Sequence, residues 1–127
     1  MDDPFVIEIE PEVRLWLMNL SEHDYARAEH AAARLAGDAS TLCEPHSRHL
    51  GNGVRELRFD LGPNRDAVRI TYWLAPGRRA VLLTVFRKTK QREDAEVARA
   101  KQAKAVCQAA HEPAHDVFVR DTQQGGL

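Results

Sequence analysis

A run of alternating residues decides the fold: VRELRFDLGPNRDAVRITYWL, residues 54–74. Apolar and polar side chains alternate on both sides of the turn-forming segment GPNRD, residues 62–66, which is the pattern of an antiparallel hairpin with one buried face. The predicted buried face carries Leu57, Phe59, Leu61, Val68, Ile70, Tyr72 and Leu74. The other face carries Glu56, Arg58, Arg69, Thr71 and Trp73.

Two further strands extend this hairpin. Residues 75–77 form a second turn, and the stretch from Arg79 to Phe86 is apolar enough for a central strand. Short turns between three consecutive strands predict an antiparallel meander. The segment FVIEI, residues 5–9, predicts a short first strand that pairs with an edge or with the centre of this sheet.

Helical patterns flank the strands. A first helix begins at Pro11, and an alanine-rich helix covers residues 22–36 between the capping residue Ser21 and Gly37. Residues 38–53 read as a loop, and residues 91–111 as a helix that Pro113 ends. We therefore predict an α+β domain over residues 1–112, with the two N-terminal helices and the C-terminal helix packed on one face of an antiparallel sheet. Residues 113–127 are predicted to be a partly disordered tail.

Composition excludes several classes of protein. With 127 residues, 29% charged and 43% hydrophobic, the chain has the size and balance of one globular domain. It contains no apolar stretch near the roughly 20 residues of a membrane span. The acidic N-terminus does not resemble a signal peptide, and Cys43 and Cys107 form no disulfide framework. These features predict a cytoplasmic protein.

Charge is unevenly distributed along the sequence. Residues 1–44 hold three basic and ten acidic residues, whereas residues 78–104 hold nine basic and three acidic ones. The basic segment includes Arg87, Lys88 and Lys90 at the end of the third strand. Arg58 and Arg69 lie on the polar face of the hairpin. Together with this basic strand end, they predict a concave cationic surface suited to a polyanion such as RNA. The alternative is a solvated strand end with no such role.

Four segments in series resemble the phage-derived Gp49/HigB branch of the RelE toxin superfamily: LGNGVRELRF (50–59), VRITYW (68–73), VLLTVFRKTKQ (81–91) and EVARAKQAK (96–104). The resemblance covers residues 5 to 105 and implies a RelE-like fold. It also implies a toxin of a type II toxin–antitoxin system that cleaves mRNA on the ribosome without metal or other cofactor. The implied partners are the ribosome, mRNA and a cognate antitoxin with a helix-turn-helix DNA-binding domain, and no membrane.

The candidate site residues follow from the chemistry of RNA cleavage. Attack by the neighbouring 2′-hydroxyl needs a group that takes its proton, cations that stabilise the phosphorane, and a proton donor for the leaving 5′-oxygen. Arginine is a phosphate clamp but not a base. By resemblance, Arg58 falls where some relatives carry a catalytic lysine, and Arg69 matches the arginine of R-I-x-Y. We therefore predict a catalytic set of Arg58, Arg69, Lys88 and His49, and RNA-binding residues Arg55, Arg87, Lys90 and Trp73.

Other functions stay open at the level of sequence. A toxin of the same fold can act without catalysis by binding a protein target such as gyrase, and an inactive relative can bind only its antitoxin. His49 has the alternative of an ordinary loop histidine, and Arg58 that of a surface ion pair. The string HEPAH, residues 111–115, spells a zinc-protease motif, but Pro113 would break the helix that this motif needs. No metal site is therefore expected.

Overall fold

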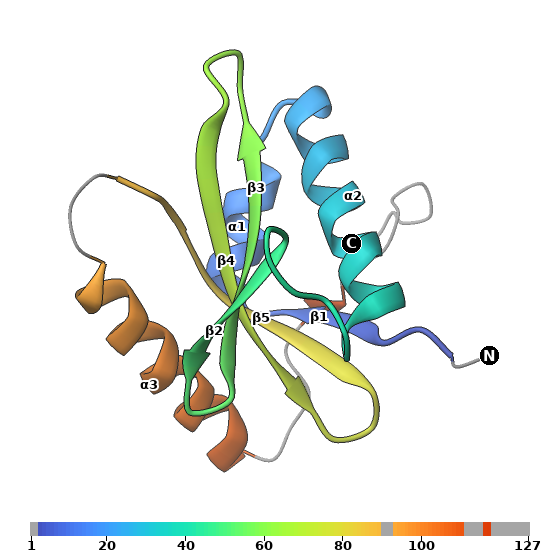
Figure 1. Ribbon diagram of the computed structural model, residues 1–127, viewed down its shortest axis with the longest axis vertical. Helices are drawn as coiled ribbons and strands as arrows, with labels where there is room; N and C mark the ends of the chain where they lie inside the picture. Colours follow the sequence, from blue (N-terminus) through green and yellow to red (C-terminus); the bar gives the residue numbers. More distant parts are fainter. Residues whose placement is uncertain (1–2, 90–92, 111–115, 118–127) are drawn as a thin grey trace.

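The computed structural model describes residues 3–89, 93–110 and 116–117. Its elements form a six-stranded sheet in the order β2-β3-β4-β5-β1-β6 (Figure 1). Along the chain they are β1 (Val6–Ile9), α1 (Pro11–Met18), α2 (Glu22–Asp38), β2 (Ser47–Gly51), β3 (Val54–Leu61), β4 (Asp66–Ala75), β5 (Arg79–Arg87), α3 (Asp94–Ala110) and β6 (Asp116–Val117). None of the described helices is both long and apolar enough to cross a membrane.

The predicted meander and its faces are confirmed. Strands β3 and β4 pair in antiparallel register from Val54 opposite Trp73 to Leu61 opposite Asp66, and β5 pairs antiparallel with β4. Strand β5 lies in the centre of the sheet, because β1 pairs with its other edge. That pairing is parallel, so the sheet is mostly rather than wholly antiparallel.

The prediction of a loop over residues 38–53 is wrong at β2. Residues 47–51 form a strand that pairs antiparallel with the first half of β3. Its sequence, SRHLG, lacks apolar alternation because β2 is an edge strand and only one of its side chains is buried. That side chain is Ser47, which is buried and whose Oγ lies 2.6 Å from the hydroxyl oxygen of Tyr72.

Helices α1 and α2 cover the predicted apolar face. Val13 and Leu35, one from each helix, are completely buried in a cluster with Leu57, Ile70 and Tyr72 from the sheet. The predicted cap is present, since the Oγ atom of Ser21 accepts a hydrogen bond of 3.1 Å from the backbone N–H of Asp24. The predicted stop at Gly37 is wrong, because α2 continues to Asp38 and the following Ala39 is buried in the same cluster.

Helix α3 lies on the opposite face of the sheet from α1 and α2, which corrects the prediction that all helices share one face (Figure 1). Its residues Ala103 and Cys107 pack against a second apolar cluster formed by Trp73, Ala75, Val81 and Leu83. A register shift in the β4–β5 pairing leaves Leu83 without a partner on β4 and adds it to this cluster. The second face is therefore apolar over half its length, and α3 covers that half.

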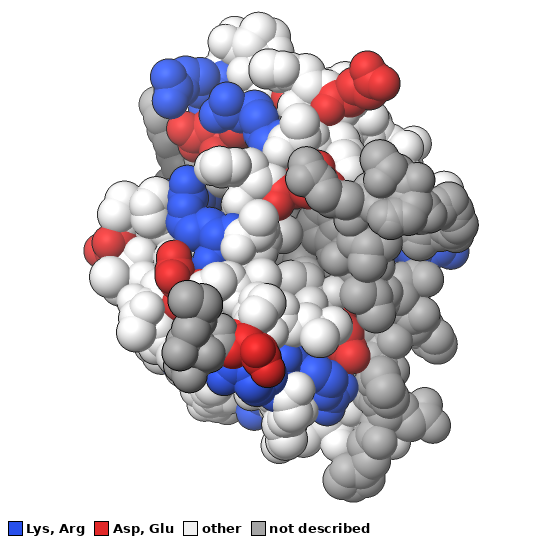
Figure 2. Space-filling view, turned by 90° about the vertical axis from the view of Figure 1, so that its right-hand side faces the viewer, with Lys and Arg blue, Asp and Glu red and all other residues white. Residues whose placement is uncertain are grey.

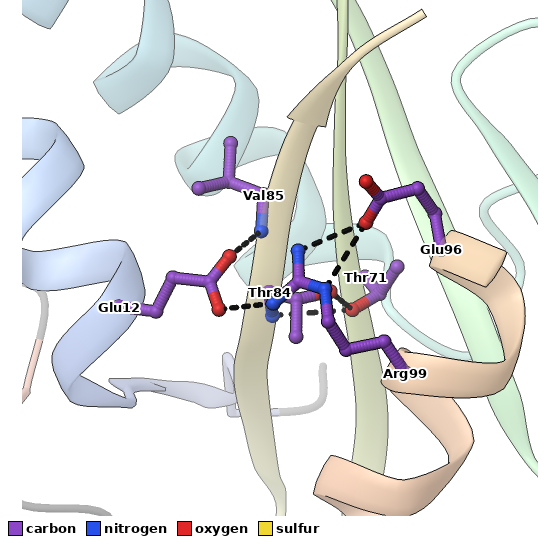
Figure 3. A network of polar contacts seen from close by, with 6 residues as sticks. All are labelled: Glu12, Thr71, Thr84, Val85, Glu96 and Arg99. Atoms are coloured by element: carbon purple, nitrogen blue, oxygen red, sulfur yellow. Dashed lines mark hydrogen bonds and ion pairs between the residues drawn. The ribbon is translucent and has the colours of Figure 1, made fainter. Parts of the chain in front are cut away.

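A polar network ties α3 to the other layers (Figure 3). One carboxylate oxygen of Glu12 accepts a hydrogen bond of 3.0 Å from the backbone N–H of Val85, and the other accepts from Arg99 of α3. Arg99 also donates to Glu96 at 2.9 Å. The hydrogen bond to Glu12 is the main cause that raises the pKa of the Arg99 guanidinium. Strand β1 pairs only as far as Leu82, so Glu12 satisfies a backbone group that the sheet leaves open.

Two predictions fall on parts of the chain that the structure does not describe in full. The helix end at Pro113 lies outside the described residues, as does most of the predicted tail. Within that tail, the two residues of β6 pair antiparallel with β1, where Glu8 is opposite Val117.

Candidate functional site

Three charged side chains from β3 and β4 meet on the face that α3 partly covers. Arg58 and Arg69 are directly opposite each other in the β3–β4 ladder, and Glu56 lies two residues before Arg58 on the same face. One carboxylate oxygen of Glu56 lies 3.7 Å from the Nε atom of Arg58 and 3.6 Å from that of Arg69. We call these three residues the hairpin cluster.

Burial dominates the electrostatics of the hairpin cluster. The side chains of Glu56 and Arg69 are 5% and 7% exposed, whereas that of Arg58 is 23% exposed. Loss of water raises the pKa of the Glu56 carboxyl, and the attraction of Arg69 and Arg58 only partly opposes this effect. Burial, followed by repulsion from Arg58, lowers the pKa of the Arg69 guanidinium.

The hydrogen bonds of Arg69 are incomplete. One terminal nitrogen of its guanidinium donates to the carbonyl oxygen of Val68 at 3.1 Å. Its Nε–H is buried and, within the described part of the chain, has no hydrogen-bond partner. The carboxylate oxygen of Glu56, 3.6 Å from this nitrogen, is just beyond hydrogen-bond distance. A buried donor without a partner is costly, so an anionic oxygen brought closer would satisfy this N–H.

Lys88 lies near the hairpin cluster. Its backbone N–H donates to the carbonyl oxygen of Ala67 at 2.9 Å, which continues the ladder one step beyond β5. Its ammonium nitrogen lies 3.5 Å from a carboxylate oxygen of Glu93. Glu93 also acts electrostatically on Glu56 and on Arg69, whose pKa values it raises. Lys88 and the hairpin cluster therefore share one acidic neighbour.

Two of the other predicted site residues lie on the face covered by α2. His49 is opposite Arg55 in the β2–β3 ladder, and the guanidinium of Arg55 donates to the carbonyl oxygen of Ala39 at the end of α2, at 3.2 Å. Directly opposite residues of an antiparallel pair share a face, so the structure does not bring His49 and Arg55 to Arg58.

The remaining predicted RNA-binding residues are also separate from the hairpin cluster. Arg87 is opposite Val68, a residue of the α1–α2 core, and is paired with Asp66 at 2.9 Å. Trp73 is only 7% exposed and lies beneath α3, with the ammonium of Lys104 at 5.1 Å from its ring centroid. Its ring thus does not face solvent, as base stacking would require. Lys90 lies outside the described residues.

The prediction of an open cationic surface is therefore wrong about the exposure of Arg69, and it omits the carboxylate of Glu56. Arg69 is buried rather than exposed, on the face of the sheet against which α3 packs. Glu56 was not among the site residues predicted from the sequence. Its signal was the spacing Glu56-x-Arg58, which places both side chains on one face of a strand.

Among the described residues, no group of three or more histidine, cysteine or acidic side chains is arranged to hold a metal ion. The motif HEPAH, residues 111–115, lies outside them.

Comparison with known proteins assigns the chain to a family. A search of curated proteins returned no match. The model of one family, described as phage-derived protein Gp49-like (DUF891), matches residues 15–105. This match begins within α1, extends over most of α3 and includes every residue of the hairpin cluster. Because it extends over more than half of the sequence, the protein belongs to the phage-derived Gp49-like family.

Proposed function

We propose that this chain acts in the cytoplasm as the toxin of a type II toxin–antitoxin system and cleaves mRNA on the ribosome. Its membership of the Gp49-like family relates it to RelE-type proteins of toxin–antitoxin systems. The observation that carries the proposal is the buried carboxylate of Glu56, held between the guanidinium groups of Arg58 and Arg69. This arrangement combines a base with two phosphate-binding cations.

The proposed reaction is attack of a ribose 2′-hydroxyl oxygen on the adjacent phosphorus. Glu56 takes the proton of the hydroxyl, and Arg58 and Arg69 stabilise the negative charge of the phosphorane. The bond between phosphorus and the 5′-oxygen then breaks, and Lys88 supplies a proton to that oxygen. The products are a 2′,3′-cyclic phosphate and a free 5′-hydroxyl, so the reaction consumes neither water nor metal.

The environment of Glu56 suits the role of a base. An ordinary carboxylate is a weak base at neutral pH, and a base is most effective when its pKa lies nearer the working pH. Burial moves the pKa of Glu56 in that direction. Neither arginine could replace Glu56 as the base, because guanidinium keeps its proton at neutral pH.

A phosphate would reach the hairpin cluster from the side on which Arg58 lies. Arg58 is the most exposed of the three side chains, so a phosphate would meet it first. A phosphate bound there would bring anionic oxygens towards the Nε–H of Arg69, which makes no hydrogen bond within the described residues. Full engagement of Glu56 requires a further opening of this face, which α3 covers beside it.

The test compares induced expression of four variants with that of the wild type. We expect Glu56→Gln, Arg58→Ala and Arg69→Ala to lose growth arrest and cleavage of a reporter mRNA, scored by primer extension. Removal of one transition-state donor typically lowers the rate by about 100- to 1000-fold. Arg87→Ala is the matched control. It also removes an arginine, but Arg87 is the last residue of β5 and lies on the face opposite to the hairpin cluster. This variant should remain toxic.

Stability measurements must accompany this test. Arg58→Ala removes a partly exposed side chain and should change the free energy of unfolding by less than about 1 kcal/mol. Arg69→Ala leaves the buried Glu56 with one cation fewer and should cost more, about 1–3 kcal/mol. If Glu56→Gln and Arg58→Ala fold and still cleave the reporter as the wild type does, the catalytic proposal is wrong.

The burial of Glu56 and Arg69 favours one alternative, a toxin of the same fold that acts by binding a protein target such as gyrase. In that case the hairpin cluster would be an internal ion pair, as buried charges often are. Induced expression would then damage DNA rather than stop translation, and the arginine variants would lose activity only as far as they lose stability. A relative that only binds its antitoxin would do neither.

A further inference from the structure

A second cationic site lies on the α2 face of the sheet, and Arg58 of the hairpin cluster is one of its lining residues. A groove of about 560 Å³ runs between α2 and the half of β3 that β2 does not cover. Its lining includes four arginines and three histidines, and among the described lining residues Asp60 is the one carboxylate. Such a lining attracts anions even when all three histidines are neutral.

One face of α2 supplies four of these seven side chains. His23, Arg27, His30 and Arg34 follow one another at intervals of four, three and four residues, and all four line the groove. This spacing keeps them on one side of the helix, extended over about 16 Å at a rise of 1.5 Å per residue. The other side of α2 carries the buried Ala28, Ala32 and Leu35.

Arg27 and Arg34 are fixed in position without being neutralised. The Nε–H of Arg27 donates to the backbone carbonyl oxygen of Asp60 at 3.0 Å. A terminal nitrogen of Arg34 lies 3.0 Å from Nδ1 of His46, which must be the acceptor because arginine can only donate. Both acceptors are uncharged, and within the part of the chain that the structure describes neither arginine is paired with a carboxylate.

Guanidinium groups held this way are suited to phosphate. Each carries five N–H donors in a planar fork, and the contacts above use one donor of each side chain. The free donors match the oxygens of a phosphate. The length of the stripe suits a chain of phosphates rather than one small anion, and the half-buried ring of Phe59 adds an apolar surface among the cations, as in sites for single-stranded nucleic acid.

We propose that this groove binds the sugar–phosphate backbone of single-stranded RNA as a second contact that takes no part in the chemistry. The inference rests on the proposed function, because Arg58 connects the two sites: it lines the groove and lies 3.7 Å from Glu56. An RNA strand whose scissile phosphate lies at Arg58 would continue past the open part of β3 and along α2.

The binding would depend on this groove rather than on a general positive surface. Figure 2 views the molecule from the side on which α2 lies, and shows basic side chains in separate groups with acidic side chains near them. The chain as a whole carries a formal net charge of −1. Loss of Arg27 and Arg34 should therefore weaken RNA binding more than loss of two arginines elsewhere.

The test measures binding of a fluorescein-labelled, 2′-O-methyl single-stranded RNA, which the full-length protein cannot cleave, over a series of salt concentrations. Each lost phosphate contact lowers the slope of log K against log salt by roughly 0.7, so Arg27→Gln with Arg34→Gln should lower it by roughly 1.4. Arg27→Lys with Arg34→Lys keeps both charges and should retain most of the slope. Arg14→Gln with Arg78→Gln, two exposed arginines outside the groove lining, is the control for net charge.

The outcomes separate this inference from the proposed function. An unchanged slope in the folded glutamine double variant, or an equal loss in the Arg14 and Arg78 control, overturns the groove as an RNA site. If the double variant does not fold, Arg27→Gln alone decides by the same slope, because that side chain is exposed. Cleavage of the reporter mRNA by the wild type is scored separately: RNA binding through the groove without cleavage would refute the proposed function and support the groove.

Discussion

At the scale of single residues, burial rather than the number of charges sets the properties of the hairpin cluster. The pKa of Glu56 is raised although two arginines lie within 4 Å, because the loss of water outweighs their attraction. The Glu56 carboxyl therefore binds its proton more tightly in the folded protein than in the unfolded chain. A group of this kind contributes stability at low pH and loses it as the pH rises through its raised pKa.

A comparison with Glu56→Gln isolates this effect, since the other titrating groups are common to both proteins. We expect the free energy of unfolding of the wild type, relative to that of the variant, to fall as the pH rises from about 4.5 upward. Urea denaturation of both proteins at several pH values between roughly 4 and 7 measures it. A difference that stays constant with pH would show that Glu56 is not desolvated as described.

At the scale of elements, α3 is attached to the sheet by few strong contacts. Ala100 is its only fully buried residue within the described part, and the network of Glu12, Arg99 and Glu96 provides much of its polar attachment. Glu12→Ala removes the contact to Arg99 and leaves the N–H of Val85 without its acceptor, which should cost about 1–3 kcal/mol.

Hydrogen exchange measures the consequence for α3, whose amides should exchange faster in Glu12→Ala than in the wild type. Glu22→Ala is the matched control, because it removes an exposed glutamate from the first turn of α2 and should leave α3 unaffected. If α3 keeps its full protection in Glu12→Ala, apolar contacts with Trp73 and Leu83 hold it instead.

At the scale of the whole molecule, charge is polarised between segments. The predominantly acidic segment, residues 1–44, contains β1, α1 and α2. The predominantly basic segment, residues 78–104, contains β5 and much of α3.

We expect the antitoxin to cover the basic segment with an acidic or amphipathic segment of its own. The dissociation constant of that complex should then increase with salt, because ions screen such contacts over about 10 Å at 0.1 M. Titration calorimetry at several salt concentrations measures it, and a salt-insensitive complex on α1 and α2 would contradict this expectation.

The sequence by itself determined the local features of this protein. The alternation in residues 54–74 assigned the apolar residues from Leu57 to Leu74 to their correct faces, because the period of a strand depends only on the backbone. The cap at Ser21 and the central position of β5 were equally predictable, the first from a short spacing and the second from an apolar run. The family resemblance came from these strands together with the segment 96–104 of α3.

Only the tertiary structure decided which of these side chains lie together and which are buried. Arg69 was predicted to face solvent, but α3 packs on its side of the sheet, and no local pattern specifies what covers a face. Arg27 and Arg34 belong to the most acidic segment of the sequence, yet α2 places them beside Arg58 in a cationic groove. Burial and clustering arise from contacts between residues far apart in the chain, and these contacts shift pKa values and create binding sites that the order of residues does not display.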